Sequence, residues 1–525
     1  MQITNMSFPL FFLWFIIIVF SILVYKRLVL LSKCKAKLHL PPTPATLPII
    51  GNLHQLGRLP HRSLQSLSNK YGDLMLLYFG NRATLIVSSP KVAEEIMKTR
   101  EHLFLDRPKL RFIDTIFYQG NDVGFSSYGD NWRYMKSICV MELLSNKRVE
   151  SFRSIREEEV ARLIKEIKLS SNNIGSSSAF NLSEISSALF KGLICRTALG
   201  RKYDDRESGK EDIYGMFKEL ADVMGEVSVG DYIPFLAWID TFTGLENRVA
   251  NVHKQFDAFI EQIVQDHEIR FNNTDDDDDD DDKDAAHGNN NVQDFVDVLL
   301  KIQRENPQQL SRDNIKGVIL DILGAGTDTS TTLLGWAMTE LLRHPKKMKK
   351  LQEEVRDIVK TKTKTKTRVT ESELANINYL KAVIKETLRL HPPVPLSGYR
   401  ESSQHVKIDK YEIRAKTQVI VNAWAIQRDP RFWEDPENFH PERFLNNSID
   451  FRGQHFQFIP FGAGRRGCPG VSLGIITIQL VLASLVYQFN WSLPNGETTL
   501  DTAERWGVSV RRRTPLILVA TPYLN

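Results

Sequence analysis

The chain has 525 residues, of which 42% are hydrophobic, and its formal net charge is only +4. So small a net charge argues against nucleic acid as a partner, because it produces no strong electrostatic field. The four cysteines, at positions 34, 139, 195 and 468, are far apart and form no C-x-x-C pair, which argues against a disulfide framework or a structural zinc site. Length alone would allow about three domains, but no flexible linker divides the chain cleanly.

The amino-terminal segment predicts a membrane anchor. Residues 8–25 carry no charge and are long enough for one membrane span. A cleaved signal peptide is the alternative, but it would need a basic stretch first, and no residue before Lys26 is basic. The positive charges that follow place the rest of the chain in the cytosol, and they are Lys26, Arg27, Lys33, Lys35 and Lys37. We expect an uncleaved anchor over residues 1–30, a basic and proline-rich linker over 31–52, and a catalytic domain over 53–525.

Hydrophobic periodicity predicts a mainly α fold with minor β structure. The predicted elements are helices over residues 157–167, 294–302 and 346–359, and strands over residues 74–87, 405–421 and 506–520. Two low-complexity tracts lie among them, eight aspartates at 275–282 and a lysine–threonine repeat at 360–367. Such runs are usually solvated loops, so we assign neither of them to the functional site.

The sequence also predicts a long helix that begins near Ser311 and ends before Pro345. At about 1.5 Å per residue, this helix would be roughly 50 Å long. Its middle holds Gly324, Gly326 and the small or polar residues 327–332, and each glycine costs a helix about 1 kcal/mol relative to alanine. Poor helix formers inside a strong helix predict a functional or strained site. The alternative is that hydroxyl groups bond back to carbonyls and merely bend the helix.

Residues 461–470, with the sequence Phe-Gly-Ala-Gly-Arg-Arg-Gly-Cys-Pro-Gly, carry the strongest functional signal. A metal-ligating thiolate needs backbone N–H groups close by, and glycines let the backbone approach. The apolar run over residues 471–486 predicts a helix, which would place Cys468 just before a helix N-terminus, where an anion is favoured. Arg465 and Arg466 add positive charge beside it. The pattern therefore predicts that Cys468 is a metal ligand.

Two other interpretations of this loop were considered. Gly462, Gly464 and Gly467 also spell the G-x-G-x-x-G fingerprint of dinucleotide-binding folds, which requires an acidic residue about 20 positions later. No aspartate or glutamate lies between Cys468 and Gly496, so this interpretation fails. A lone cysteine is otherwise most often a small buried apolar residue, and only the flanking glycines and arginines favour a ligand here.

The ten-residue pattern resembles the haem-binding loop of the cytochrome P450 superfamily. Further matches lie at residues 41–52, at 325–329 (Ala-Gly-Thr-Asp-Thr), at 386–389 (Glu-Thr-Leu-Arg) and at 441–444 (Pro-Glu-Arg-Phe). Together they are similar to a plant A-type microsomal member of specialised metabolism. The resemblance implies the cytochrome P450 fold preceded by a single N-terminal transmembrane helix. It also implies a b-type haem whose iron takes Cys468 as its axial thiolate ligand.

The same resemblance implies the residues around the haem. Asp328 and Thr329 would be the catalytic acid–alcohol pair that relays protons through water towards dioxygen. The side chains at positions that bind haem carboxylates are Trp132, Arg400 and Arg466. Lys136 stands at a further such position, where arginine is commoner, and lysine lacks the bidentate fork of arginine.

The resemblance assigns two further sets of residues. Glu386, Arg389 and Arg443 would form a buried triad that is structural and stabilises the cysteine-loop region. The substrate pocket would be lined by largely apolar segments, namely residues 111–125, the helix before Asp328, and residues 394–399 and 506–508.

The implied function is a haem-thiolate monooxygenase in the endoplasmic reticulum membrane, single-pass, with its catalytic domain facing the cytosol. It would use dioxygen and electrons from an NADPH-cytochrome reductase to oxidise a hydrophobic plant metabolite, and terpenoid, alkaloid and phenolic scaffolds all fit. One alternative keeps the fold but changes the reaction to dehydration, rearrangement or oxidative coupling. Another is a noncatalytic haem protein or a membrane scaffold. The Asp328–Thr329 pair favours oxygen activation, because an electron carrier would not need it.

Overall fold

The computed structural model describes residues 14, 18, 19, 21, 22, 39–171, 179–203, 213–275, 292–362, 368–497 and 499–523. The predicted membrane span over residues 8–25 lies outside this part of the chain except at five positions, so it stays a prediction. Most of the two low-complexity tracts, at 275–282 and 360–367, also lies outside the described residues.

Helices make up most of the described chain. The α-helices are α2 (Pro60–Tyr71), α3 (Pro90–Glu94), α4 (Arg111–Ile116), α5 (Asp130–Ile138), α6 (Asn146–Ser151), α7 (Arg153–Ser171), α8 (Leu182–Leu199), α9 (Ile213–Gly225), α10 (Val229–Tyr232), α11 (Trp238–Phe242), α12 (Leu245–Asp275), α13 (Phe295–Glu305), α14 (Arg312–Arg343), α15 (Pro345–Lys362), α16 (Glu371–Leu374), α17 (Asn378–Leu390), α18 (Ala423–Ile426) and α19 (Val471–Gln488). The strands are β1 (Leu74–Phe79), β2 (Arg82–Val87), β3 (Phe180–Asn181), β4 (Leu396–Glu401), β5 (Val406–Ile408), β6 (Tyr411–Ile413), β7 (Gln418–Asn422), β8 (Phe489–Ser492), β9 (Glu504–Arg505), β10 (Arg511–Arg512) and β11 (Ile517–Pro522). The predicted mainly α fold with minor β structure is confirmed.

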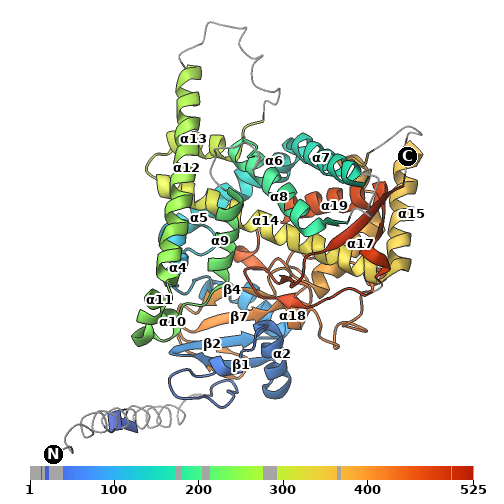
Figure 1. The fold of residues 1–525 in the computed structure, drawn as a ribbon. Coiled ribbons are helices and arrows are strands. Elements are labelled where there is room, and N and C mark those ends of the chain that lie inside the picture. The colour runs from blue at the N-terminus through green and yellow to red at the C-terminus, as the bar shows by residue number, and fades with distance from the viewer. Residues whose placement is uncertain are drawn as a thin grey trace, which may run out of the picture.

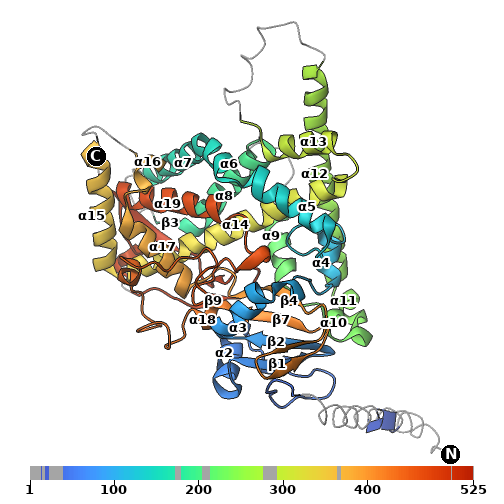
Figure 2. The ribbon, with the colours of Figure 1, turned by 180° about the vertical axis from the view of Figure 1, so that it is seen from behind.

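The largest sheet and the long helices lie at different ends of the molecule, with α14 passing through the middle of the helices (Figures 1 and 2). This sheet has the strand order β1-β2-β7-β4, in which β2 and β7 are parallel and the other neighbours are antiparallel. Both faces are apolar, because Leu85 and Val419 belong to one core cluster while Met75 and Ile86 belong to another. Covering on both faces explains the nearly continuous apolar runs of β2 and β7.

Helix α14 forms where the sequence predicts it. Its N-cap is Ser311, whose hydroxyl oxygen accepts from the Asn314 N–H at 3.1 Å, while the Asn314 side chain accepts from the Ser311 N–H at 3.1 Å. The helix runs through its predicted weak centre, where the Thr329 hydroxyl donates to the Ala325 carbonyl at 2.7 Å. The same back-bonding joins the Thr331 hydroxyl to the Thr327 carbonyl at 2.9 Å. The hydroxyls therefore bond within one continuous helix.

The most apolar helix of the described chain is α19. By length and composition, it is the one described helix that could cross a membrane, but 67% of it is buried inside the protein. Leu480, Val481 and Leu485 are fully buried in the same cluster as α14 residues such as Leu334 and Leu341. Helix α19 is therefore a core helix and does not correspond to the predicted N-terminal span.

Most of the other predicted elements are confirmed, and one is partly wrong. The three predicted helices form, since residues 157–167, 294–302 and 346–359 lie within α7, α13 and α15 apart from residue 294, which comes directly before α13. The strands predicted over residues 74–87 and 405–421 correspond to β1, β2 and β5 to β7. Within the strand predicted over residues 506–520, only β10 and the start of β11 form. Residues 506–510 form no strand, because this segment bonds elsewhere. The Val510 N–H donates to the Pro393 carbonyl at 2.8 Å, and the Val510 carbonyl accepts from the Trp336 indole at 3.0 Å.

The predicted structural triad is present. Arg389 donates two hydrogen bonds of 2.8 Å to the two carboxylate oxygens of Glu386, and Arg443 donates a third at 3.1 Å. Glu386 and Arg389 are completely buried. The remaining Arg389 N–H groups reach the carbonyls of Gln427 and Pro436, so the triad fixes the segment that leads into the cysteine loop.

Candidate active site

The cysteine loop is held in a compact turn just before α19. The Cys468 N–H donates to the Phe461 carbonyl at 3.0 Å, and the Gly467 N–H donates to the Gly464 carbonyl at 2.9 Å. Gly464 has a φ of +69°, and a Cβ there would lie 2.1 Å from the Met97 carbonyl oxygen. Only glycine fits this position. Helix α19 begins three residues after Cys468, as the sequence predicts.

This loop opens onto an internal cavity of about 310 Å³. Cys468 and Thr329 both line it, and so do Ala325 and Gly326 of α14. Helix α8 contributes Phe190, Leu193 and Ile194, and the loop before α5 contributes Val123 and Gly124. The structure therefore brings the predicted metal ligand and the predicted catalytic alcohol to one largely apolar space, although they come from distant parts of the sequence.

Two thiols border the cavity, and their surroundings differ. Burial raises the pKa of the Cys139 thiol to about 12, and the negative charge of Asp321 acts in the same direction. Burial also raises the pKa of the Cys468 thiol, and a hydrogen bond from the Gly470 N–H opposes that rise. The charge of Lys136 opposes the rise in pKa at both thiols. Cys468 therefore has the groups that stabilise a thiolate, which supports its prediction as the metal ligand.

Three arginines converge beside the cavity, namely Arg400 and Arg466, which the sequence predicts, and Arg107, which it does not. Their hydrogen bonds go to backbone carbonyls. Arg400 donates to Ala463 at 3.1 Å. Arg466 donates to Leu105 at 2.9 Å and to Ser126 at 2.8 Å. Arg107 donates to Gly124 at 3.0 Å and also to Tyr399.

Burial makes this arginine cluster electrostatically costly. It lowers the pKa of Arg400 and of Arg466 to about 9, and in both cases the charge of Arg107 adds to the effect. The pKa of Arg107 itself falls to about 10 through burial. Nearby carboxylates oppose this effect only in part, Asp122 at Arg107 and Arg466 and Glu101 at Arg400. The cluster can therefore accommodate a further anionic group. Two carboxylates of a haem fit that description.

The other predicted cofactor residues, Trp132 and Lys136, also lie at this edge and line the cavity. The Trp132 indole donates to the Val123 carbonyl at 3.0 Å, and the Arg466 guanidinium stacks 4.0 Å from the centre of its ring. The Lys136 ammonium donates to the Gly467 carbonyl at 2.8 Å. Lys136 therefore contacts the cysteine loop directly, and its predicted contact with a haem carboxylate stays a prediction.

The predicted acid–alcohol pair is divided between two sides of α14. Thr329 lines the cavity, but Asp328 does not. One carboxylate oxygen of Asp328 accepts a hydrogen bond from the Ser509 hydroxyl, and the other lies 3.7 Å from an Arg511 nitrogen. Gly326 packs against α8, where a Cβ would lie 2.7 Å from the Ile194 Cδ1 atom. Its predicted role, a close approach to a flat cofactor, stays a prediction.

The pocket-lining prediction is correct in part. Residues 123 and 124 and the helix before Asp328 line the cavity as expected, whereas residues 394–399 and 506–508 do not. Those segments instead pair with β7 or lie in the turn between β9 and β10. Helix α8, which the sequence reasoning did not include, supplies part of the wall.

A buried carboxyl pair is the other feature that sequence reasoning missed. Asp321 of α14 lines the cavity and accepts from the N–H groups of Val123 at 2.7 Å and Gly124 at 3.1 Å. Burial raises the pKa of Asp321 to about 6, and burial followed by the charge of Asp321 raises the pKa of Asp122. The pair fixes the cavity loop to α14. A single acid within the apolar run of residues 318–323 was the available signal.

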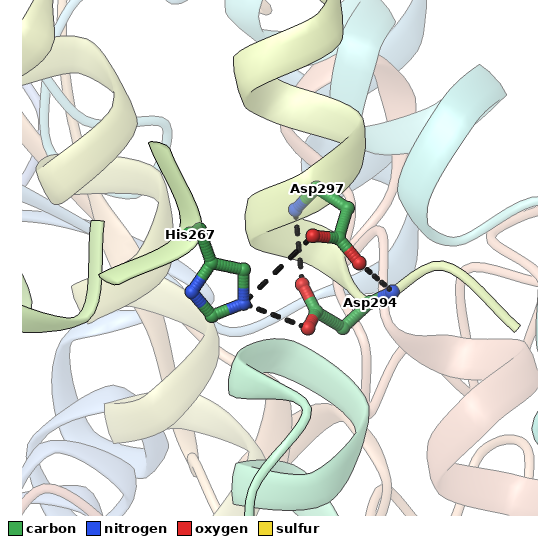
Figure 3. Close-up of side chains that lie close together, drawn as sticks. All are labelled: His267, Asp294 and Asp297. Carbon is green, nitrogen blue, oxygen red and sulfur yellow. Dashed lines mark hydrogen bonds and ion pairs between the residues drawn. The ribbon is translucent and has the colours of Figure 1, made fainter. Parts of the chain in front are cut away.

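A second group of potential metal ligands, His267, Asp294 and Asp297, lies outside the cavity at the junction of α12 and α13 (Figure 3). The His267 Nδ1–H donates to the Ile263 carbonyl at 2.7 Å, and Nε2 lies 2.9 Å from Asp294. Asp294 and Asp297 also form the capping box of α13. Their side chains are therefore engaged in joining and capping two helices, and we assign them a structural role.

Comparisons with known proteins agree with this geometry. A model of the cytochrome P450 family matches residues 41–519. Cytochrome P450 71A1 of Persea americana is 48% identical over 481 residues, which cover 90% of this chain and 92% of that protein. Cytochrome P450 736A117 of Prunus mume is 47% identical over 492 residues, which cover 92% of this chain and 90% of that protein. Norfluorocurarine oxidase of a Strychnos species is 44% identical over 506 residues, covering 96% of each protein.

A solved structure supports the fold. A zebrafish cytochrome P450 in complex with abiraterone superposes with a TM-score of 0.73 at 24% sequence identity, covering 89% of this chain and all of that chain. The family match extends over most of the sequence, and the relatives named above are plant proteins. The chain therefore belongs to the cytochrome P450 family, as a plant A-type member whose cofactor is a thiolate-bound haem.

Proposed function

We propose that this protein is a membrane-anchored monooxygenase that uses dioxygen and electrons from a separate NADPH-cytochrome reductase to oxidise a hydrophobic plant metabolite. Family membership supports the reaction class. The observation that carries the proposal is that Cys468 and Thr329 line one apolar cavity beside three arginines, of which Arg400 is buried and Arg107 and Arg466 are half-buried. The haem, when bound, supplies the redox chemistry that activates dioxygen.

The residues around the cavity have separate tasks in this proposal. Cys468 ligates the haem iron, and the guanidinium groups of Arg107, Arg400 and Arg466 neutralise the haem carboxylates. Trp132 holds Arg466 in place by stacking. These tasks use charge and geometry that the chain itself provides.

Thr329 supplies a hydroxyl inside the cavity. Its Oγ1–H donates to the Ala325 carbonyl at 2.7 Å, so its oxygen can accept a hydrogen bond while its one proton is engaged. When the hydroxyl turns from Ala325 towards the cavity, it can donate that proton to a reacting oxygen and accept another from water. This placement favours oxygen activation over dehydration, rearrangement or coupling, for which no such hydroxyl is required.

The cavity wall supports a hydrophobic substrate. The apolar residues that line it include Val123, Phe190, Leu193, Ile194, Ile322 and Leu333. The carboxyl of Asp321 is one of few polar groups among them. Such a wall fits a terpenoid, alkaloid or phenolic scaffold with a limited number of polar substituents.

The partner that delivers electrons would approach near the cysteine loop. Arg465 in this loop, Arg133 on α5 and Lys98 beside Met97 carry side chains that are 60%, 59% and 52% exposed. Each of these three cations forms an ion pair with a carboxylate of this chain, and those carboxylates belong to Glu101, Asp130 and Glu94. Carboxylates of a partner can replace them on this exposed surface. We propose a reductase with an acidic docking surface as that partner.

A metabolite screen tests the proposed function. Microsomes that contain the protein and a reductase are incubated with NADPH and a panel of terpenoids, alkaloids and phenolics, which includes norfluorocurarine because a relative is named for its oxidation. We expect a product with one added oxygen atom, detected by mass, and none when the reductase is left out. A product of water loss, or haem-loaded protein with no product from any class, would contradict the proposal.

The role of Thr329 has its own test. In Thr329→Ala, we expect the haem to bind normally while the product formed per NADPH consumed falls by about 10-fold or more, because the hydroxyl that can relay a proton is lost. Thr331→Ala is the matched control, because the Thr331 hydroxyl bonds back within α14 in the same way but does not line the cavity. Equal coupling in the two variants would remove Thr329 from the mechanism.

We also propose that the protein lies in the endoplasmic reticulum membrane with its catalytic domain facing the cytosol. The described residues of the predicted span include Trp14 and Ile18, whose side chains are 61% and 52% exposed. A second exposed apolar group lies on and before α11, where Phe235, Trp238 and Phe242 are 61%, 61% and 85% exposed. Exposed apolar groups of this size favour contact with a lipid surface.

Deletion and substitution separate the two membrane contacts. Removing residues 1–30 should move a substantial fraction of the protein from the microsomal pellet to the supernatant. Adding the changes F235S, W238S and F242S should release most of the rest, because each large apolar side chain contributes about 1.5–3 kcal/mol when buried. Met141→Ser, at a 66% exposed apolar residue outside the α11 group, serves as the control. Unchanged sedimentation after the deletion would contradict the anchor.

A further inference from the structure

One face of α14 carries a row of side chains that contact the hairpin formed by β9 and β10. The row consists of Asp328, Thr332, Trp336 and Thr339, which recur at helical spacing. The Trp336 indole donates to the Val510 carbonyl at 3.0 Å. Arg512 donates to the Thr339 hydroxyl at 2.8 Å. The hairpin is therefore fixed along the side of α14 that faces away from the cavity.

At the Asp328 end of this row, hydroxyl groups form a directed chain. Ser509 is only 1% exposed, and its hydroxyl donates to a carboxylate oxygen of Asp328. The Thr332 and Ser509 hydroxyl oxygens lie 2.8 Å apart. A serine hydroxyl has one proton, which Ser509 gives to Asp328, so Thr332 must donate to Ser509. Both hydroxyl protons therefore point towards the Asp328 carboxylate.

A cation completes the surroundings of Asp328 and links it to another helix. Arg511 lies 3.7 Å from Asp328 and 3.6 Å from Asp222 of α9. The end of α9 packs on the same hairpin, because a Cβ at Gly225 would lie 3.2 Å from the Gly507 Cα atom. Asp328 and Asp222 therefore share one guanidinium.

We propose that Ser509 and Arg511 are positioning residues for Asp328, which hold its carboxylate on the hairpin side of α14, and that Asp222 competes with Asp328 for Arg511. This inference rests on the proposed function together with the acid–alcohol role that the sequence resemblance implies for Asp328 and Thr329. A donated hydrogen bond and a neighbouring cation both attract a carboxylate. These contacts therefore determine where the Asp328 carboxylate lies relative to Thr329.

The arrangement predicts effects of opposite sign. The groups that face Asp328 are the Ser509 hydroxyl and the Arg511 guanidinium, and Asp222 and Arg505 act beyond Arg511. Ser509→Ala or Arg511→Gln removes a group that holds the Asp328 carboxylate on the hairpin side of α14. Asp222→Asn leaves Arg511 to Asp328 alone, so this carboxylate is held more firmly there. Arg505→Gln is the matched control, because Arg505 lies 3.9 Å from Asp222 and forms no ion pair with Asp328 among the described contacts.

The test measures the hydrogen peroxide released per NADPH consumed, with full-length protein, reductase and no added substrate. We expect S509A and R511Q to shift this ratio in the same direction as Asp328→Asn, and D222N to shift it in the opposite direction. Arg511→Lys, which keeps the charge, should restore the ratio nearly to that of the unmodified protein. If S509A and R511Q give the same ratio as R505Q, the proposal is wrong.

A measurement that does not depend on turnover tests the contact itself. The denaturant midpoint of unfolding is compared for S509A, D328N and the double variant. We expect the double variant to lose clearly less stability than the sum of the two single losses, because both changes break the same hydrogen bond. Additive losses would overturn the contact. If the unmodified protein with reductase consumes no NADPH, the proposed function fails, which is distinct from an unchanged peroxide ratio in the variants.

Discussion

The centre of this molecule depends on how it compensates buried positive charge. Arg107, Arg400 and Arg466 lie close together in the protein, and they donate hydrogen bonds to backbone carbonyls. Burial lowers the pKa of all three arginines, and the charge of Arg107 lowers the pKa of the other two further. An anionic group beside them would remove that cost. Because Arg466 belongs to the cysteine loop, the same cluster also determines where Cys468 stands relative to that anion.

Helix α14 serves two different surfaces with two adjacent residues. Successive helical residues point about 100° apart, so the side chains of Asp328 and Thr329 cannot face the same space. Thr329 faces the cavity, whereas Asp328 faces Ser509 and Arg511 of the C-terminal hairpin. The acid is thus next to the reaction space in sequence but bonded to a different part of the protein. Control of the proton supply can therefore be separate from the shape of the substrate pocket.

The local signals in the sequence were sufficient for the elements and for the cysteine loop. Helix α14 begins at the Ser311 cap and ends before Pro345 because capping and proline act over a few residues. Gly464 and its neighbours could be interpreted as a tight loop for the same reason. The prediction for residues 506–510 was wrong, since their alternation indicated a strand while their backbone groups bond to Trp336 and Pro393.

Long-range contacts explain what the sequence could not show. Arg107 acts through Tyr399 and Gly124, and nothing in its neighbourhood marks it as part of a cofactor site. Ser509 matters because the fold places it on Asp328, 181 positions away. The catalytic role of the pair Asp328–Thr329 stays a prediction, and the orientation of the two side chains depends on tertiary structure. Tertiary placement, not residue type, therefore distinguishes the roles of these residues.

The central claim is that Cys468 is the haem ligand, and two cavity-lining cysteines allow a controlled test. The reduced carbon monoxide spectrum is recorded for the unmodified protein, Cys468→Ala and Cys139→Ala. The Cys139 thiol borders the same cavity, but burial raises its pKa to about 12. The account predicts the spectrum of a thiolate haem in the unmodified protein and in Cys139→Ala, and its loss in Cys468→Ala. A thiolate spectrum that persists in Cys468→Ala would contradict the account.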